Sequence, residues 1–191
     1  MAKLKLGIIV GSNRRESINR KLAQALAKLA GDKFETQFLQ IDDLPLFNQD
    51  NENPLPAPAA RFKSEIEASD AVLFVTPEHD RSIPALLKNA IDWGTRPYGK
   101  NSWRGKPAAV TGTSGGAIST AIAQTQLRGI ISSSSGMHVM GGEAYIQFRP
   151  DLIDGQGNVT DDNVSKFLKT FVDQFAVFAG KLTSNEQRRA A

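Results

Sequence analysis

The feature that most limits the fold is an apolar run near the N-terminus that stops abruptly in a polar segment. Residues 7–10 are Gly-Ile-Ile-Val, and residues 11–19 then carry glycine, hydroxyl, amide and arginine groups. Such a run is typical of a strand buried in a parallel sheet, and a helical pattern follows it. A loop that brings backbone N–H groups, hydroxyls and arginines to the start of a helix is suited to bind phosphate. The chain therefore opens with a predicted strand, anion-binding loop and helix.

The polar loop lacks the two common nucleotide-binding patterns. It contains neither the G-x-x-x-x-G-K-[ST] of nucleoside-triphosphate sites nor the G-x-G-x-x-G of dinucleotide sites. Ser12, Ser17 and Asn19 are instead spaced to surround one terminal phosphate, with Arg14 or Arg15 supplying charge. The alternative is that Ser17 only caps the helix and that the two arginines form a solvated pair.

Length and composition narrow the class of protein. The 191 residues predict one domain, which we expect to span residues 1–183, followed by a frayed tail over 184–191. Without cysteine and with two histidines, the chain offers no thiolate nucleophile, and we expect no metal site. The net charge of +3 is spread over scattered lysines and arginines, which favours small anions over nucleic acid. No signal peptide or membrane-spanning run is evident, so we expect a cytoplasmic location.

Strand-like and helix-like segments alternate along the whole chain. The predicted strands are Lys3–Val10, Phe34–Gln40 at a sheet edge, Ala71–Thr76, Pro107–Gly112 and Met137–Met140, with Ala144–Phe148 as a candidate continuation of the last. The predicted helices are Ser17–Ala30, Ala59–Ala68, Pro84–Trp93, Ala117–Ser132 and Asn163–Leu182, and Ile41–Pro58 is predicted to be a long loop. This alternation predicts an α/β fold of three layers, in which helices cover both faces of a five-stranded parallel sheet.

Three polar loops follow the first, third and fourth predicted strands. They are residues 11–19, 77–82 and 111–116. In a sheet of strand order 2-1-3-4-5 these three strands are neighbours, and ligands of such sheets bind at the carboxyl ends of the strands. We therefore expect the three loops to meet at one site.

The second and third loops each admit two interpretations. The backbone of residues 77–84, with His79 and Asp80, can border the ring of a flavin, although Asp80 or Ser82 can also be an ordinary helix cap. The glycine-rich residues 111–117 allow close approach of a ligand, and the helix start favours the negative charge of a reduced flavin. Glycine-serine loops are also common as plain connections. A hydrolase triad is not indicated, since G-x-S-x-G is absent.

Taken together, these loops resemble the NADPH-dependent FMN reductase family, and in particular its quinone and chromate reductase branch. The family's G-S-x-R-x-x-S-x-N loop is matched by Gly11, Ser12, Arg14, Ser17 and Asn19. Its P-E-Y-N-x-S-I-P and L-K-N-A-I-D-W motifs are similar to residues 77–84 and 87–93. Its later R-P, G-K-P, glycine-rich and helix motifs resemble residues 96–97, 105–107, 114–117 and 124–128. The resemblance covers residues 4–180.

The resemblance implies a flavodoxin-like domain that binds FMN and uses NAD(P)H as co-substrate. It implies that hydride passes from nicotinamide C4 to flavin N5, and that a quinone, an azo compound, a ferric species or a metal oxyanion such as chromate is then reduced in the same cleft. No side chain is required as a catalytic group. A homodimer or homotetramer is implied, with a neighbouring subunit completing the cleft. The alternatives are a flavodoxin-type electron carrier and a non-catalytic FMN-binding protein.

The matched loops also predict which residues bind the cofactor. They are Gly11, Ser12, Arg14, Ser17, Ile18, Asn19, Pro77, Glu78, His79, Asp80, Arg81, Ser82, Thr113, Ser114, Gly115 and Gly116. Two positions depart from the family, since His79-Asp80 replaces Tyr-Asn and Thr125 replaces a tyrosine. An ionised Asp80 near the ring is expected to disfavour the reduced anion. The alternative is that Asp80 points away, caps the helix after Pro84 and pairs with Arg81.

Overall fold

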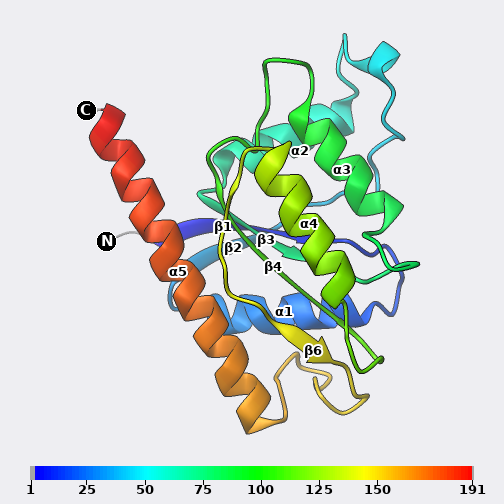
Figure 1. Ribbon diagram of the computed structural model, residues 1–191, viewed down its shortest axis with the longest axis vertical. Coiled ribbons are helices and arrows are strands. Elements are labelled where there is room, and N and C mark those ends of the chain that lie inside the picture. The colour runs from blue at the N-terminus through cyan, green and yellow to red at the C-terminus, as the bar shows by residue number, and fades with distance from the viewer. Residues whose placement is uncertain (1–2, 191) are drawn as a thin grey trace.

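The computed structural model describes residues 3–190, with side chains described through residue 184. Its strands are β1 (Leu4–Val10), β2 (Phe34–Phe38), β3 (Ala71–Val75), β4 (Pro107–Ser114), β5 (His138–Val139) and β6 (Tyr145–Gln147). Its helices are α1 (Ile18–Ala30), α2 (Ala57–Ala68), α3 (Ala85–Thr95), α4 (Ala121–Ser133) and α5 (Asp162–Ala190), with a short 3-10 turn, η1 (Gln49–Asn51). Figure 1 shows their arrangement.

The sheet has the predicted strand order. Its path is β2-β1-β3-β4-β5, and each of these pairings is parallel. β2 lies at the edge, as its mixed polar pattern indicated. The register aligns Val10 at the end of β1 with Val75, which in turn lies beside Thr111 of β4. The carboxyl ends of these three neighbouring strands therefore lie at the same edge of the sheet.

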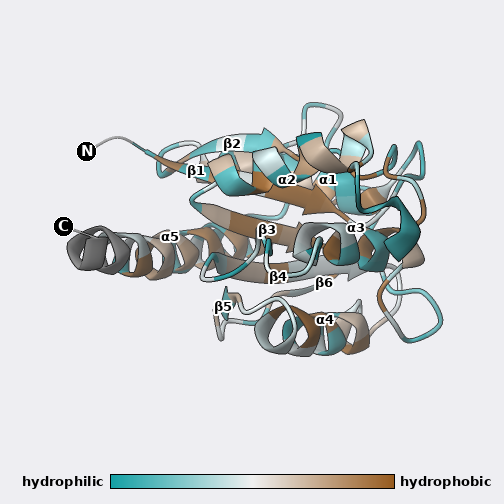
Figure 2. Ribbon diagram, turned by 90° about the horizontal axis from the view of Figure 1, so that it is seen from above, coloured by the Kyte–Doolittle hydropathy of each residue, from teal (hydrophilic) through white to brown (hydrophobic). Residues whose placement is uncertain are grey.

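Helices cover both faces of this sheet, which gives the predicted three layers (Figures 1 and 2). Side chains alternate along each strand, so Ile8 packs with α1 and α5, whereas Ile9 packs with α2, α3 and α4. On the first face, the rings of Phe34 and Phe175 have centroids 5.8 Å apart. On the second face, Trp103 packs against Phe74. In Figure 2 the central strands are largely hydrophobic and lie between these helices, whereas the edge strand β2 is largely hydrophilic.

The fifth predicted strand is divided in two. Both β5 and β6 pair with β4 in parallel, so the candidate continuation lies along the same strand, as expected. Residues 140–144 separate the two segments, and two backbone carbonyls there accept hydrogen bonds from the guanidinium of Arg128 in α4: Met140 O at 2.6 Å and Gly142 O at 2.7 Å. Burial lowers the pKa of this guanidinium below its ordinary value, although Tyr145 and Glu143 oppose the shift.

Several element boundaries differ from those predicted. β4 continues to Ser114 because β6 pairs with its last residues, whereas the sequence predicted a strand end at Gly112. α4 begins at Ala121 rather than Ala117, since residues 117–120 form turns. α5 continues past residue 183, where the folded domain was expected to end.

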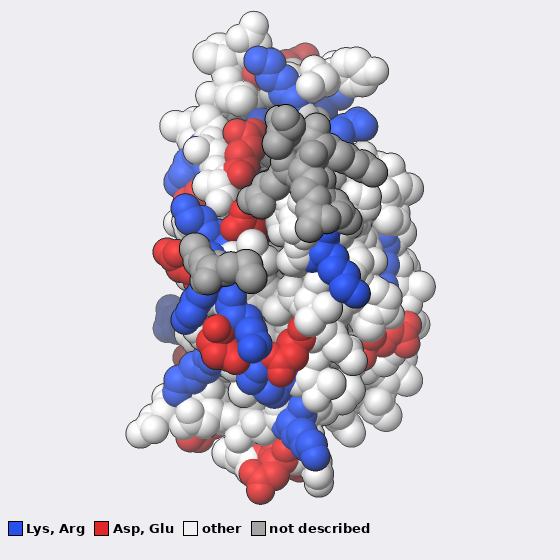
Figure 3. All heavy atoms as spheres, turned by 90° about the vertical axis from the view of Figure 1, so that its left-hand side faces the viewer, with Lys and Arg blue, Asp and Glu red and all other residues white. Residues whose placement is uncertain are grey.

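The surface carries both signs of charge. On the face drawn in Figure 3, lysines and arginines are interspersed with aspartates and glutamates. Within residues 3–190, no helix has both the length and the apolar composition needed to cross a membrane. The same part of the chain contains no group of three or more His, Asp or Glu residues arranged to hold a metal ion.

Candidate active site

The three polar loops meet at the carboxyl edge of the sheet, as predicted. The loop after β1 and the loop after β3 line a hollow of about 440 Å³, which we call the first hollow. The loop after β3 and the loop after β4 line a second hollow of about 630 Å³. The turn at residues 78–81 supplies side chains to both hollows, so they adjoin one another.

The first loop combines a helix start with an unpaired cation. Ser17 caps α1, since its hydroxyl accepts a hydrogen bond from Arg20 N at 3.2 Å. No acidic residue lies in the first turn of α1, so the positive end of the helix dipole is not neutralised. Arg14 lines the first hollow with Gly11, Ser12, Ser17 and Ile18. Among the described residues its guanidinium has no carboxylate within ion-pair distance. This donor set suits a phosphate dianion.

Gly11 lies in a confined position where the first two loops come together. A Cβ at this position would lie 3.3 Å from Pro77 Cδ and 3.2 Å from Leu87 Cδ2. Those distances are shorter than ordinary van der Waals contacts, so a larger residue would require Pro77 or Leu87 to shift by a few tenths of an ångström. The predicted glycine therefore allows the first hollow's walls to pack closely at this point.

Asn19, which was predicted to contact the cofactor, lines neither hollow. Its side chain is 2% exposed and is fully turned toward β4: Nδ2 donates to Thr113 O at 2.9 Å, and Oδ1 accepts from Thr113 N at 2.9 Å. Thr113 is also buried, and its hydroxyl donates to Ile146 O at 2.6 Å. Both residues were predicted to contact the cofactor. In the structure they join the start of α1 to the end of β4, and so position the loops.

The second loop is a tight two-residue turn. His79 and Ser82 exchange both backbone hydrogen bonds, at 3.0 Å and 2.8 Å. Asp80 and Arg81 between them have φ values of 47° and 62°, the left-handed conformation of a type I′ turn. The capping interpretation of Asp80 and Ser82 is wrong, because α3 is preceded by Pro84 and has no side-chain cap. Asp80 and His79 are exposed at the two hollows, at positions where a ligand can reach them.

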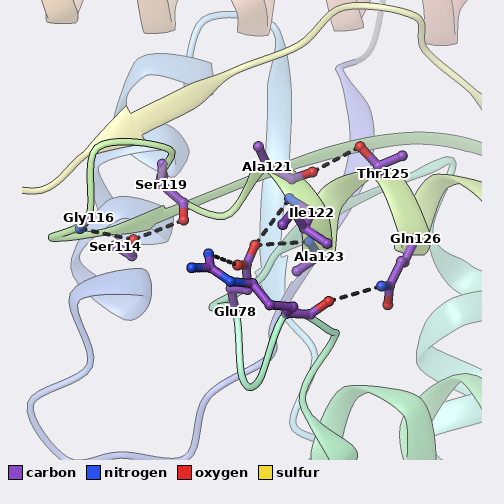
Figure 4. Close-up of polar contacts among 10 residues, drawn as sticks. Glu78, Ser114, Gly116, Ser119, Ala121, Ile122, Ala123, Thr125 and Gln126 are labelled. Atoms are coloured by element: carbon purple, nitrogen blue, oxygen red, sulfur yellow. Dashed lines mark hydrogen bonds and ion pairs between the residues drawn. The ribbon is translucent and has the colours of Figure 1, made fainter.

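Glu78 anchors this turn to α4 (Figure 4). Its side chain is 7% exposed, and Oε2 accepts from the backbone N–H groups of Ile122 and Ala123, both at 3.1 Å. Oε1 pairs with Arg81 at 3.0 Å, so Arg81 pairs with Glu78 rather than with Asp80. The carboxylate thus supplies the cap that α4 otherwise lacks.

Gln126 is a positioning residue that the sequence analysis missed. Its Nε2 donates to Arg81 O at 2.9 Å, and its Oε1 accepts from Ser82 Oγ at 2.7 Å. Together with Glu78 it fastens the 78–82 turn at both ends to one helix (Figure 4). The sequence signal is weak, because Gln126 lies 44 residues from Ser82 and the matched helix motif at 124–128 does not indicate its partners.

The hydroxyl of Ser114 fixes the conformation of the third loop through two hydrogen bonds. Ser114 Oγ donates to Ser119 O at 3.0 Å and accepts from Gly116 N at 3.2 Å. Gly115 has nothing within 4 Å of a Cβ position, and its neighbours Ser114 and Gly116 line the second hollow. Gly112 was not singled out as a site residue, yet a Cβ there would lie 2.0 Å from Thr76 O. It lets β3 and β4 end side by side.

Comparison with known proteins agrees with this geometry. The sequence profile of the family described as NADPH-dependent FMN reductase matches residues 4–151. The chain is 45% identical over 175 residues to a 2-hydroxy-1,4-benzoquinone reductase of Burkholderia sp, covering 92% of this chain and 96% of the relative. It is 46% identical over 172 residues to a quinone reductase of Pseudomonas putida, covering 90% and 92% of the two chains.

A solved structure shows the same relationship in three dimensions. FerB, a flavoenzyme NAD(P)H:(acceptor) oxidoreductase from Paracoccus denitrificans, superposes with a TM-score of 0.90 at 47% identity, covering 93% of this chain and 98% of that one. A flavodoxin, WrbA-like protein from Agrobacterium tumefaciens shares the fold at 14% identity and a TM-score of 0.61. The strand order, the loop convergence and these matches lead to one assignment: the chain belongs to the NADPH-dependent FMN reductase family.

Proposed function

We propose that the chain is an FMN-dependent NAD(P)H:quinone oxidoreductase. The observation that carries the proposal is the pair of adjoining hollows at the carboxyl ends of β1, β3 and β4. One hollow has a helix start and a free arginine, and the other is bordered by glycine backbone. The relatives named as quinone reductases support the choice of acceptor.

The residues present fit an FMN molecule. Ser12, Arg14 and the start of α1 would hold its phosphate in the first hollow. The 78–81 turn and the backbone of residues 114–116 would border its ring toward the second hollow. When bound, FMN supplies the hydride-accepting and hydride-donating chemistry that no side chain of this protein has.

The protein's own contribution is placement. Glu78 and Gln126 hold the 78–82 turn before any ligand arrives, so little ordering cost remains on binding. Asn19 keeps the β1 and β4 loops at a fixed separation. The open space at the exposed residue Gly115, beside Ser114 and Gly116 of the second hollow, would admit a flat substrate.

The test uses the purified protein. The protein should bind FMN more tightly than riboflavin, because riboflavin has no phosphate to bind Arg14. Equal affinities for the two flavins would contradict the phosphate assignment. Under anaerobic conditions NADPH should bleach the flavin absorbance, and initial rates with a quinone should give parallel double-reciprocal lines. A flavodoxin-type carrier or a non-catalytic FMN-binding protein would bind FMN without steady-state NADPH oxidation.

Finer properties of the protein stay predictions. Reduction of chromate, ferric or azo compounds is proposed from the family resemblance alone, and so are a homodimeric or homotetrameric assembly and a cytoplasmic location. Initial rates with each acceptor and the sedimentation of the purified protein would test the first two.

A further inference from the structure

A third hollow adjoins the first at the β2 side of the sheet. Its volume is about 250 Å³, and it shares Ser12 and Leu86 with the first hollow. Its other walls come from the first turn of α1 and from residues 38–42 after β2. The three hollows therefore form a row along the carboxyl edge of the sheet. FMN, as proposed above, accounts for only two of them.

The third hollow contains an unused cation. Arg20 lines it, and among the described residues this guanidinium has no hydrogen-bond acceptor and no carboxylate within ion-pair distance. Arg20 lies in the first turn of α1, where the helix dipole disfavours positive charge and no acidic residue compensates. Arg14 and Arg15 are also exposed at this helix start. Arg14 lines the first hollow, where the flavin phosphate is proposed to bind, so Arg20 in the third hollow stays available to a second anion.

The remaining walls suit a nucleoside. Phe38 is 40% exposed and presents an aromatic ring to the hollow, beside the apolar side chains of Leu39 and Ile41. Gln40 and Asp42 add an amide and a carboxylate that can meet the polar edge of a base or a ribose. An exposed ring, polar groups and a free guanidinium match the three parts of an adenosine phosphate: base, sugar and anion.

We propose that this third hollow binds the adenosine 2′-phosphate end of NADPH. Arg20 receives the 2′-phosphate and Phe38 packs against the adenine. Asp42 opposes the extra charge, because a carboxylate suits the 2′-hydroxyl of NADH and repels the phosphate of NADPH. The pair Arg20 and Asp42 thus sets the preference between the two co-substrates. This inference rests on the proposed function, since it assumes a nicotinamide end directed toward the second hollow.

The primary test is ligand binding to the FMN-loaded protein by isothermal titration calorimetry. The probes are adenosine 2′,5′-bisphosphate and 5′-AMP, which differ by the 2′-phosphate. Arg20→Ala should weaken the bisphosphate at least about tenfold, the loss expected for one charge-assisted bond, and leave 5′-AMP within about twofold. The control is Lys21→Ala, which removes an equal charge from the next residue of α1, one that pairs with Glu16 outside the hollow. It should leave both affinities within about twofold.

Substitutions of Arg20 and Asp42 should change the affinity for the bisphosphate in opposite directions. Asp42→Asn should strengthen the bisphosphate, because a like charge is removed, and should lower the KM for NADPH relative to NADH. Equal weakening of both probes by Arg20→Ala, or no weakening, would overturn the assignment. An equal loss of FMN affinity would do so too, since Arg20 would then belong to the flavin phosphate.

Failure of this inference can be told apart from failure of the proposed function. If NADPH bleaches the flavin in the wild type but Arg20→Ala binds the bisphosphate normally, only the adenosine site is refuted. If neither NADPH nor NADH bleaches the flavin, the proposed function is refuted, and the adenosine site falls with it because it assumes that co-substrate.

Discussion

Replacing Asn19 by alanine tests whether this residue positions the site or contacts the cofactor. The change removes both hydrogen bonds between the Asn19 side chain and the Thr113 backbone. The N–H and C=O groups of Thr113 are then unpaired in a buried position. Each unpaired buried group costs about 1–3 kcal/mol, so the free energy of unfolding should fall by about 2–6 kcal/mol for the two groups. That is a large part of the roughly 5–15 kcal/mol that stabilises a typical domain.

The assay is urea unfolding, followed with and without saturating FMN. Asn19→Ala should lower the midpoint in both conditions, and it should also weaken FMN because the β1 and β4 loops are no longer joined. The matched variant is Ser12→Ala, at the rim of the first hollow, whose hydroxyl makes one long 3.4 Å contact with Arg14 N. It should weaken FMN while changing stability by less than about 0.5 kcal/mol.

Two results would refute this reasoning. If Asn19→Ala weakens FMN but leaves the unfolding midpoint of the FMN-free protein unchanged, the amide acts on the phosphate, as the family motif had suggested. If both the midpoint and the FMN affinity are unchanged, the bonds to Thr113 contribute neither stability nor placement.

Three further predictions concern charged side chains. Glu78→Gln keeps the shape of a side chain that is 7% exposed but removes the charge at the start of α4, so we expect a loss of about 1–2 kcal/mol in thermal unfolding; an unchanged Tm would contradict the anchoring role. Asp80→Asn preserves a residue type that tolerates the observed φ of 47° and should raise the flavin midpoint potential, measured by dye equilibration; no shift, or a downward one, excludes the electrostatic role. The backbone N–H of Val164 is the largest cause that lowers the pKa of Asp161 below 3.8. The stability it adds is therefore present above that pH and is lost as the pH falls through the lowered value, so Asp161→Asn should flatten the acid limb of Tm against pH, and superimposable curves would contradict this.

Local patterns in the sequence were enough to predict the architecture. Ile8 and Ile9 belong to a run that is apolar at every position, and such a run must be covered on both faces, as the two helix layers do. Glycine and hydroxyl residues after three such strands then located the site, because the carboxyl ends of parallel neighbours share one edge. Periodicity and turn chemistry depend on residues close together in the chain, and this is why they could be read without a structure.

The partners of individual side chains came only from the tertiary structure. The sequence predicted Asn19 and Glu78 as cofactor residues, yet their polar atoms are bonded to Thr113 and to the start of α4, 94 and 44 residues away. The end of β4 depends in the same way on β6, because pairing with residues 145–147 extends β4 to Ser114, beyond its predicted end at Gly112. The free guanidinium of Arg20 became visible only once β2 and α1 had brought the walls of the third hollow together. A motif records which residue types are present, whereas long-range packing decides which hydrogen bonds and charges remain free for a ligand.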